Sequence, residues 1–448
     1  MPLPPCADTV TTRKARILYR MNTSHFGTDG IRGIYGKDVT DETAYRLGAA
    51  LAKRGKILLA RDNRLSSPIL ASAFLGGVTA AGGRFSFLGL STTPALYYAF
   101  THSDAETAVM ITASHNPPDH NGLKVFDKAG KLGNDACRAL EEEMQSISLS
   151  SVSYRTERED PSLLEGYRAF FREAVGRLDG LKVAFDYAGG AGYVFRDLLP
   201  SLGAEVFPLG LSEKGDAVNV GCGALFPGAL REETLRVKAD LGIALDGDGD
   251  RILVVTKEGD ILDGDAILYL FARKMKREGS LAKDKVALTV MTNGGVLHSL
   301  TEIGVTPVLC NVGDSAVTAA MRSEGLSLGG EQSGHIVLGD LLMTGDGILV
   351  GGMLLKMLRA GEPVLLPKEL TVYPQSRIDL RLPDKSVAYA EATQAFAAEV
   401  KARLPRGRVL VRASGTENVV RIMTECPDAA LAEACAREIR DFLLSRNE

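Results

Sequence analysis

The stretch Leu241–Arg251 reads LGIALDGDGDR and indicates the fold class most directly, because a short apolar run passes straight into alternating aspartate and glycine. An apolar run of this length beside glycine is typical of a buried strand. Lys182–Phe185 likewise ends at Asp186, and Ala108–Ile111 ends at a polar loop. Amphipathic helical stretches such as Glu232–Ala239 lie between the runs. The alternation predicts α/β layers of parallel strands, with functional loops at the strand ends.

This pattern occurs three times, and the last eighty or so residues then break it. The other predicted elements of the α/β part are the strands Lys56–Leu59, Val286–Val290 and Leu326–Leu328 and the helices Asp41–Lys53 and Ala316–Ser323. The C-terminal part predicts the strands Val372–Leu382, Arg408–Arg412 and Val419–Thr424 and the helices Ser386–Arg403 and Asp428–Ser445. We therefore expect three similar α/β domains and a distinct α+β domain. The predicted limits are 1–22 for an N-terminal extension, 23–155, 156–255 and 256–368 for the α/β domains, and 369–448 for the last domain.

Composition excludes several classes of protein. The chain has 448 residues, 45% of them hydrophobic and 24% charged, which is typical of a globular protein of several domains. A net charge of −4 argues against nucleic acid as the main partner. No apolar run is long enough to predict a membrane span. Six cysteines without metal-site spacing favour a reducing compartment, and we expect a cytoplasmic protein.

The loop after Leu245 predicts a metal site. Asp246, Asp248 and Asp250 alternate with glycines, and converging carboxylate oxygens suit Mg²⁺ or Ca²⁺. An EF-hand is excluded, because its sixth and twelfth positions would be Arg251 and Lys257. The alternative is an acidic surface turn, which the flanking apolar strands disfavour.

A second loop, Thr112–Pro117, follows a predicted strand and contains Ser114 and His115. In an extended chain, neighbouring side chains point in opposite directions, so His115 is poorly placed to activate Ser114. No serine-hydrolase elbow is present either. An exposed serine that carries a phosphoryl group, near a metal and the cation of Lys124, fits better. The alternative is a plain turn at the end of a strand.

Three further segments contain glycine and carry polar or charged side chains. Arg412–Asn418, followed by Arg421, combines hydroxyls, glycine and guanidinium groups that can cradle an anion. Gly329–His335 offers a glutamate and a serine for sugar hydroxyls and a histidine for proton transfer. Phe26–Gly33 is glycine-rich and carries a guanidinium at Arg32. Taken singly, each segment is also compatible with a structural turn or hairpin.

Together and in this order, the five segments resemble the α-D-phosphohexomutase superfamily, from about His25 to the C-terminus. Thr112–Pro117 matches its phosphoserine loop, Asp246–Arg251 its metal loop, Gly330–His335 its sugar loop and Arg412–Thr416 its phosphate loop. The resemblance implies four domains around a central cleft. Phe26–Gly33, the glycines of the metal loop and the start of the sugar loop favour its glucosamine branch over the phosphomannomutase/phosphoglucomutase branch.

The resemblance also implies roles for individual residues. Ser114 would be the residue that is phosphorylated in the active enzyme. The implied Mg²⁺ ligands are a phosphoserine oxygen at Ser114, Asp246, Asp248 and Asp250. The implied catalytic and proton-transferring groups are Ser114, Lys124, Arg32, His335 and His115. The implied substrate-binding residues are Arg251, Glu331, Ser333, Arg412, Ser414, Gly415, Thr416 and Arg421.

The implied reaction converts glucosamine 6-phosphate into glucosamine 1-phosphate through a phosphoserine enzyme and a 1,6-bisphosphate, feeding UDP-N-acetylglucosamine and cell-envelope synthesis. A phosphosugar is thus the expected partner, without nucleic acid or membrane, and both a monomer and a homodimer are compatible with the sequence. The alternatives are a phosphomannomutase or phosphoglucomutase, or a catalytically silent phosphosugar-binding homologue. The sequence departs from the usual family pattern at Asn418, at Ser315 and at Gly189-Gly190, but none of these removes a proposed catalytic group.

Overall fold

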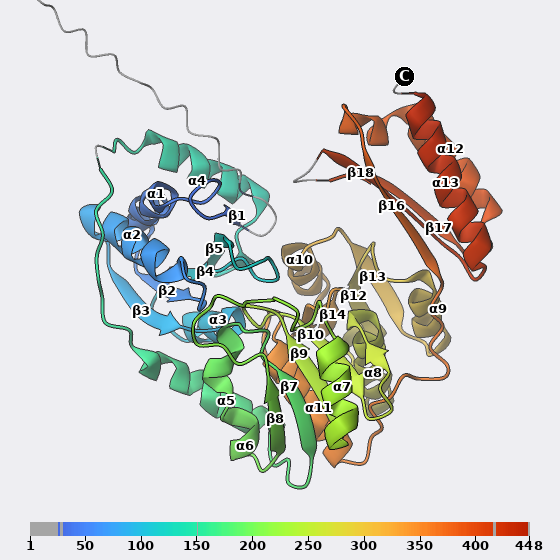
Figure 1. Cartoon of the computed structure of the whole chain (residues 1–448), viewed down its shortest axis with the longest axis horizontal. Helices are drawn as coiled ribbons and strands as arrows, with labels where there is room; N and C mark the ends of the chain where they lie inside the picture. The colour runs from blue at the N-terminus through green and yellow to red at the C-terminus, as the bar shows by residue number, and fades with distance from the viewer. Residues whose placement is uncertain (1–25, 27–29, 150, 415–417, 447–448) are drawn as a thin grey trace, which may run out of the picture.

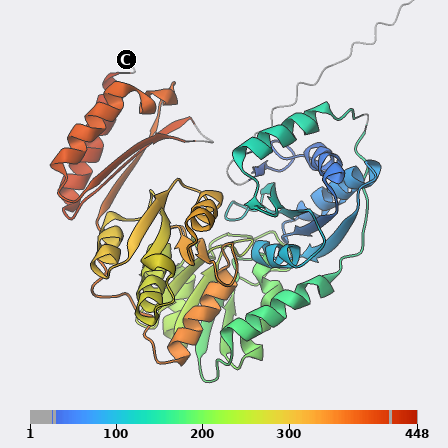
Figure 2. The ribbon, with the colours of Figure 1, turned by 180° about the vertical axis from the view of Figure 1, so that it is seen from behind.

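The computed structural model describes residue 26 and residues 30–149, 151–414 and 418–446. These residues form four structural units, each built on one sheet, and the units follow one another around an arc (Figures 1 and 2). The first and fourth units lie at the two ends of the arc, and the second and third lie side by side between them. The predicted extension, residues 1–22, lies outside the described residues.

The first three units share an α/β composition. The strands and helices of the first are β1 (Ile31–Ile34), β2 (Ile57–Arg61), β3 (Phe85–Leu90), β4 (Thr107–Ile111), β5 (His120–Asp127), β6 (Gly130–Lys131), α1 (Asp41–Leu51), α2 (Ser67–Ala80), α3 (Thr93–Thr101) and α4 (Asn134–Ser146). Those of the second are β7 (Lys182–Asp186), β8 (Glu205–Leu209), β9 (Leu241–Leu245), β10 (Ile252–Thr256), β11 (Ile261–Leu262), α5 (Glu165–Val175), α6 (Leu198–Ser201) and α7 (Gly228–Val237). Those of the third segment are β12 (Lys285–Thr289), β13 (Thr306–Cys310), β14 (Leu328–Gly330), β15 (Ile336–Leu338), α8 (Gly264–Glu278), α9 (Gly294–Glu302), α10 (Asp314–Glu324) and α11 (Gly347–Arg359).

One strand order recurs in these three sheets. It is β3-β2-β4-β5 in the first, β8-β7-β9-β10 in the second and β13-β12-β14-β15 in the third. The first three strands of each set are parallel, and the fourth is antiparallel to the third. The prediction of purely parallel layers was therefore wrong for the fourth strand. The connection before it is too short for the crossover that a parallel neighbour requires.

The fourth unit is a three-stranded antiparallel sheet covered on one face by two helices (Figure 1). Its elements are β16 (Gln375–Arg381), β17 (Arg408–Ala413), β18 (Val419–Glu425), α12 (Glu391–Arg403) and α13 (Ala429–Ser445). The predicted helix Ser386–Arg403 was wrong in its first turn. A short 3₁₀ turn, Lys385–Tyr389, precedes α12, and Ala390 between them has an extended backbone that interrupts helical hydrogen bonding.

The second and third units share a core. Helix α11, from the third segment of the chain, packs on β9, β10 and α5 of the second unit. Its N-cap residue, Asp346, accepts a hydrogen bond of 2.8 Å from the buried Tyr167 hydroxyl on α5. The predicted limit between residues 255 and 256 falls inside β10, whose sheet continues to Leu262, so we propose a limit near Asp263.

The described part of the chain contains no helix that combines the length and the apolar character needed to cross a membrane.

Candidate active site

The serine loop joins β4 to the antiparallel strand β5. Ser114 is only 2% exposed, and its backbone is left-handed, with φ of +51°. Its Oγ donates a hydrogen bond of 2.7 Å to Asp246 Oδ2 in the second unit. The expectation of an exposed serine was therefore wrong, because the neighbouring unit covers the loop.

The position of His115 also differs from the prediction. Its Nδ1 lies 3.4 Å from Ser114 Oγ, although an extended chain would separate the two side chains. The left-handed backbone at Ser114 ends the extended conformation and turns the next residue back toward the serine. A separation of 3.4 Å is a weak hydrogen bond at most, so the structure places His115 beside Ser114 without tightly pairing the two.

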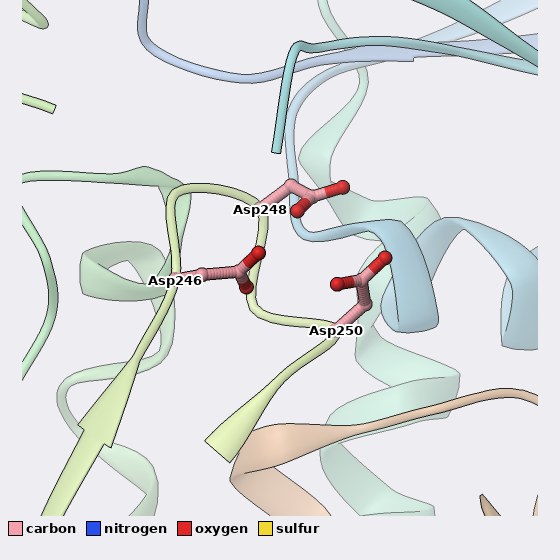
Figure 3. A group of neighbouring side chains, drawn as sticks. All are labelled: Asp246, Asp248 and Asp250. Atoms are coloured by element: carbon pink, nitrogen blue, oxygen red, sulfur yellow. The ribbon is translucent and has the colours of Figure 1, made fainter. Parts of the chain in front are cut away.

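The metal loop joins β9 to β10 and gathers three buried carboxylates (Figure 3). One oxygen each of Asp246, Asp248 and Asp250 lies within 4.8 Å of the others. Gly249 has φ of +73°, a conformation that lets the loop turn between the second and third carboxylates. The Oδ1 atoms of Asp248 and Asp250 are buried and accept no hydrogen bond from the described residues.

These carboxylates fit a divalent cation. Buried oxygen atoms without a donor are costly, and a hard cation would satisfy them. Burial, together with the charges of Asp250 and Asp248, raises the pKa of Asp246 well above its usual value. Burial would also raise the pKa of Asp250, but Lys124, His335 and Arg251 outweigh it and lower that pKa to about 2. The loop thus concentrates negative charge that needs positive partners.

Lys124 supplies one such partner from the first unit. It lies on β5, and its Nζ is 2.6 Å from Asp248 Oδ2 and 2.8 Å from Asp250 Oδ2. Thr93, at the start of α3, donates hydrogen bonds from its hydroxyl and backbone N–H to Asp248. Arg32 lies on β1 opposite Gly122, whose carbonyl accepts a hydrogen bond from Thr112 at the start of the serine loop. The first and second units are therefore joined directly through the predicted site.

The sugar loop joins β14 to β15 in the third unit. Glu331 accepts a hydrogen bond of 3.0 Å from Gly313 N, and Ser333 Oγ lies 3.4 Å from the other Glu331 oxygen. His335 is 3% exposed, and its Nε2 accepts a hydrogen bond of 3.1 Å from Gly345 N. Because Nε2 accepts, a neutral His335 carries its proton on Nδ1.

A cavity of about 90 Å³ brings groups from all three α/β units together. Its lining includes Ser114 and Lys124 from the first unit, Asp250 and Arg251 from the second, and Glu331 and His335 from the third. The structure thus brings most of the predicted catalytic, metal-binding and sugar-binding residues to one place.

Two of the predicted phosphate-binding residues line a second hollow, on the fourth unit. Arg412 and Arg421 are directly opposite on β17 and β18, and they line a groove of about 420 Å³. Burial, followed by the charge of Arg421, lowers the pKa of Arg412. Ser414 is 3% exposed within its hairpin, whereas Gly415 and Thr416 lie outside the described residues. Among described residues, the groove and the Ser114 cavity have no lining residue in common.

Several residues at the site were not predicted from the sequence. Arg377 lines the same groove, and its Nη2 donates a hydrogen bond of 3.0 Å to Gln332 Oε1 in the sugar loop. The alternation of charged residues along β16 was the available signal. Thr93, which donates to Asp248, had no such signal. Arg64 and Asn219, which donate to the Ser114 carbonyl oxygen, had none either, because the partners of all three residues are distant in sequence.

Comparison with known proteins gives the class of protein that this fold and site define. The chain matches all four domains of the phosphoglucomutase/phosphomannomutase family: domain I over residues 23–151, domain II over 165–259, domain III over 263–369 and the C-terminal domain over 378–442. The chain belongs to this family, and the resemblance to α-D-phosphohexomutases is confirmed.

Its relatives point to a particular branch. The chain is 37% identical to the phosphoglucosamine mutase of Limosilactobacillus fermentum, covering 94% of this chain and 98% of the relative. It is 39% identical to the phosphoglucosamine mutase of Actinobacillus succinogenes, covering 93% and 98%. A phosphoglucomutase/phosphomannomutase family structure from Burkholderia thailandensis has a TM-score of 0.81 at 27% identity, covering 94% and 97%. Aspergillus fumigatus N-acetylphosphoglucosamine mutase, solved with GlcNAc-6P and magnesium, shares the fold at a TM-score of 0.66 and 18% identity, covering 95% and 96%.

Proposed function

We propose that this chain is a phosphoglucosamine mutase, which interconverts D-glucosamine 6-phosphate and D-glucosamine 1-phosphate. The observation that carries the proposal is the contact between Ser114 Oγ and Asp246, beside a cavity lined by cations and sugar-binding groups. The relatives that match nearly the full length of the chain support the glucosamine substrate. The enzyme is accordingly an intramolecular phosphotransferase of the isomerase class.

Ser114 carries the phosphoryl group in this proposal. In one half of the cycle, phosphorylated Ser114 transfers its group to the sugar O1, which gives a 1,6-bisphosphate. The bisphosphate then reorients in the cleft, and its 6-phosphoryl group is transferred to Ser114. Lys124 and Arg251 line the same cavity as Ser114, and their charges balance that of the phosphate. His115 lies beside the serine as a further polar neighbour.

The sugar is held by the third unit. Glu331 and Ser333 are suited to accept and donate hydrogen bonds to its hydroxyls. His335 is the proton-transferring group in this proposal, and Nδ1 carries the proton that it can donate, because Nε2 accepts a hydrogen bond from Gly345 N. Arg32, at the base of the serine loop, adds a positive charge to the same region.

The cofactor in the proposal is Mg²⁺, held by Asp246, Asp248, Asp250 and an oxygen of the phosphorylated Ser114. The unsatisfied oxygens of Asp248 and Asp250 support this assignment. When bound, the ion polarises the phosphoryl group and neutralises charge that develops during transfer.

The distal phosphate is held by the fourth unit. Arg412 and Arg421 supply paired guanidiniums, with Ser414, Gly415 and Thr416 in the adjoining loop. The substrate is therefore a phosphosugar held at both ends. The five described cysteines are unpaired, which agrees with a cytoplasmic location.

Two measurements test the proposal. A coupled assay with the 6-phosphates of glucosamine, glucose and mannose should show the highest kcat/KM for glucosamine 6-phosphate. A preference for mannose 6-phosphate would overturn the branch but leave the family assignment intact. Intact-mass and peptide analysis after incubation with the 1,6-bisphosphate should place one phosphate on Ser114, and Ser114→Ala should abolish turnover.

A further inference from the structure

Two buried side chains hold the backbone of the serine loop. Arg64 follows β2 in the first unit and is fully buried. Asn219 lies between β8 and α7 in the second unit and is 7% exposed. Neither is among the residues that line the Ser114 cavity in the described structure. Both therefore act on the site through the chain that carries the serine.

Arg64 and Asn219 donate to the same pair of backbone oxygens. Arg64 Nη2 lies 2.8 Å from both Ser114 O and Asn116 O. Asn219 Nδ2 lies 2.9 Å and 3.0 Å from these same oxygens. A carbonyl oxygen has two lone pairs, so the two donors use the full accepting capacity of each oxygen. The backbone on either side of His115 is thus fixed from two structural units at once.

The other guanidinium nitrogens of Arg64 make further hydrogen bonds, two of them to backbone oxygens at the end of this loop. Nη1 donates to Pro117 O and, at 3.1 Å, to His120 O. Nε donates to Asp62 Oδ2 at 2.9 Å, and Asp62 is also fully buried. All five guanidinium donors are engaged, and the buried charge has a carboxylate partner. Lysine has three donors and no planar fork, so it cannot reproduce this set.

The conformation that these residues hold is otherwise unfavourable. Ser114 has φ of +51°, in the left-handed region that is unfavourable for a non-glycine residue. Such a conformation persists only when its surroundings determine it. Here it coincides with the 2.7 Å contact between Ser114 Oγ and Asp246.

The metal loop adjoins the same backbone oxygen. A Cβ on Gly247 would lie 2.6 Å from Ser114 O, closer than Cβ atoms approach other atoms, and 3.0 Å from Asn219 Nδ2, which is a tight contact. Glycine at this position therefore lets the metal loop approach the Ser114 backbone directly. This close approach brings the Ser114 backbone next to the loop that carries the three carboxylates.

We propose that Arg64 and Asn219 are positioning residues that clamp Ser114 in its left-handed conformation and align Oγ with the metal loop for phosphoryl transfer. This inference rests on the proposed function of Ser114 as the phosphoryl carrier. Because Asn219 belongs to the second unit, its hydrogen bonds also make the conformation of Ser114 depend on how the second unit packs against the first.

Asn219→Gly tests the clamp, because glycine accepts the φ of +60° at this position and removes only the side chain. Asn63→Ala is the matched control. Asn63 Nδ2 also joins the first unit to the second, through Gly189 O at 2.9 Å and Ser212 O at 2.8 Å, but it does not donate to the serine loop. We expect Asn219→Gly to lower kcat about 10- to 100-fold with KM nearly unchanged, and Asn63→Ala to keep wild-type kcat.

A wild-type kcat in Asn219→Gly, or an equal loss in Asn63→Ala, would overturn the clamp. Arg64→Lys should lower kcat at least as much, but it can also impair folding, so the comparison of Asn219→Gly with Asn63→Ala is the deciding test.

Amide hydrogen exchange of the peptide containing residues 112–120 provides a test without substrate. It should be faster in Asn219→Gly than in wild type and Asn63→Ala, and unchanged exchange would contradict the proposal. Absence of mutase turnover in wild type would refute the proposed function instead, and the exchange experiment would still test the clamp.

Discussion

The two oxygens of Asp248 have different surroundings. Oδ2 accepts hydrogen bonds from Lys124 and from the hydroxyl of Thr93. Oδ1 is buried and has no donor among the described residues. A single carboxylate thus balances a buried ammonium group and leaves one oxygen available to a cation. The charge at this position should matter for stability as well as for turnover.

Asp248→Asn should therefore lower kcat by about 100-fold or more, because it removes one charge from the metal loop. It should also lower the free energy of unfolding by about 1–3 kcal/mol, since the buried Lys124 loses one of its two carboxylate partners. A strand-end loop that buries few apolar groups would by itself predict little change in stability, but the buried pair of Lys124 and Asp248 outweighs this. Steady-state kinetics and thermal unfolding measure the two effects.

Asp119→Asn is a suitable control, because the Asp119 side chain is 65% exposed and its ion pair among the described residues is with the neighbouring His120. Mg²⁺ should raise the Tm of wild type and of this control, and should raise that of Asp248→Asn much less. Full activity of Asp248→Asn at limiting Mg²⁺ would contradict the metal assignment.

One type of hairpin carries each predicted functional loop. The serine, metal and sugar loops each connect the third parallel strand of a sheet to its antiparallel return strand. The phosphate loop connects β17 to the antiparallel β18. A loop between two paired strands has both of its ends fixed, so its polar groups are held more rigidly than at a free strand end. The precision of the site depends on this arrangement.

The return of the chain after the sugar loop creates a tight contact at Gly345. A Cβ built on Gly345 would lie 2.4–2.6 Å from three atoms of the His335 ring. Gly345→Ala should therefore displace His335 and lower kcat about 10- to 100-fold, with a smaller effect on KM. Gly228→Ala is the control, because a Cβ there meets no atom within 4 Å. Equal kinetics for the two variants would show that the His335 ring position does not limit turnover.

The strands and their terminal loops could be predicted from sequence, because apolar runs such as Leu241–Leu245 end abruptly at polar residues. The direction of the return strands was missed, although the short gap between β9 and β10 was a usable signal. The left-handed backbone of Ser114 and its contacts with Arg64 and Asn219 had no local signal. They depend on contacts between residues that are far apart in the chain.

The third and fourth units meet through buried polar groups. Glu425 on β18 is fully buried, pairs with Arg408 and accepts a hydrogen bond of 2.7 Å from Gly294 N. Asn293 Nδ2 donates to Tyr373 O in the connection between the units. Asp265, in the first turn of α8, accepts a hydrogen bond of 2.8 Å from Asn293 N. A buried acid therefore lies directly behind this interface.

The stability of this region should depend on pH. Burial, with the charge of Asp263, raises the pKa of Asp265 to about 7, against the opposing effects of Asn293, Thr292 and Arg408. The folded chain then binds more protons than the unfolded chain between about pH 4 and pH 7, so stability should fall as pH rises through this window. Asp265→Asn should abolish this fall, and its Tm advantage over wild type should grow from pH 5 to pH 8. A shift of about three pKa units sets an upper limit of about 4 kcal/mol.

The control for that measurement is Asp441→Asn on the surface of α13, where the carboxylate is 63% exposed. It should leave the pH dependence of Tm as in wild type. A parallel pH profile for Asp265→Asn and wild type would show that Asp265 does not titrate in this range.

In the proposed function, the reacting phosphate and the distal phosphate are bound by different units. The Ser114 cavity lies among the first three units, and the arginine groove lies on the fourth. Arg377 connects the edge of the groove to the sugar loop through Gln332. If the groove binds the distal phosphate as proposed, the fourth unit holds the substrate in both of its orientations. The groove should therefore influence the chemistry although it contains none of the reacting groups.

Arg412→Ala tests this relation between the units. Loss of one guanidinium–phosphate contact costs about 1.5–3 kcal/mol, or roughly ten- to hundred-fold in binding, so KM for the phosphosugar should rise. Because remote binding also orients the reacting oxygen, kcat should fall as well. Phosphorylation of Ser114 and Mg²⁺ binding should persist, as measured by intact mass and metal titration. Arg437→Ala, on the helix that covers the opposite face of the sheet, should leave the kinetics unchanged. An unchanged kcat/KM in Arg412→Ala would mean that the distal phosphate is held elsewhere, and that the paired arginines of β17 and β18 belong to an ordinary hairpin.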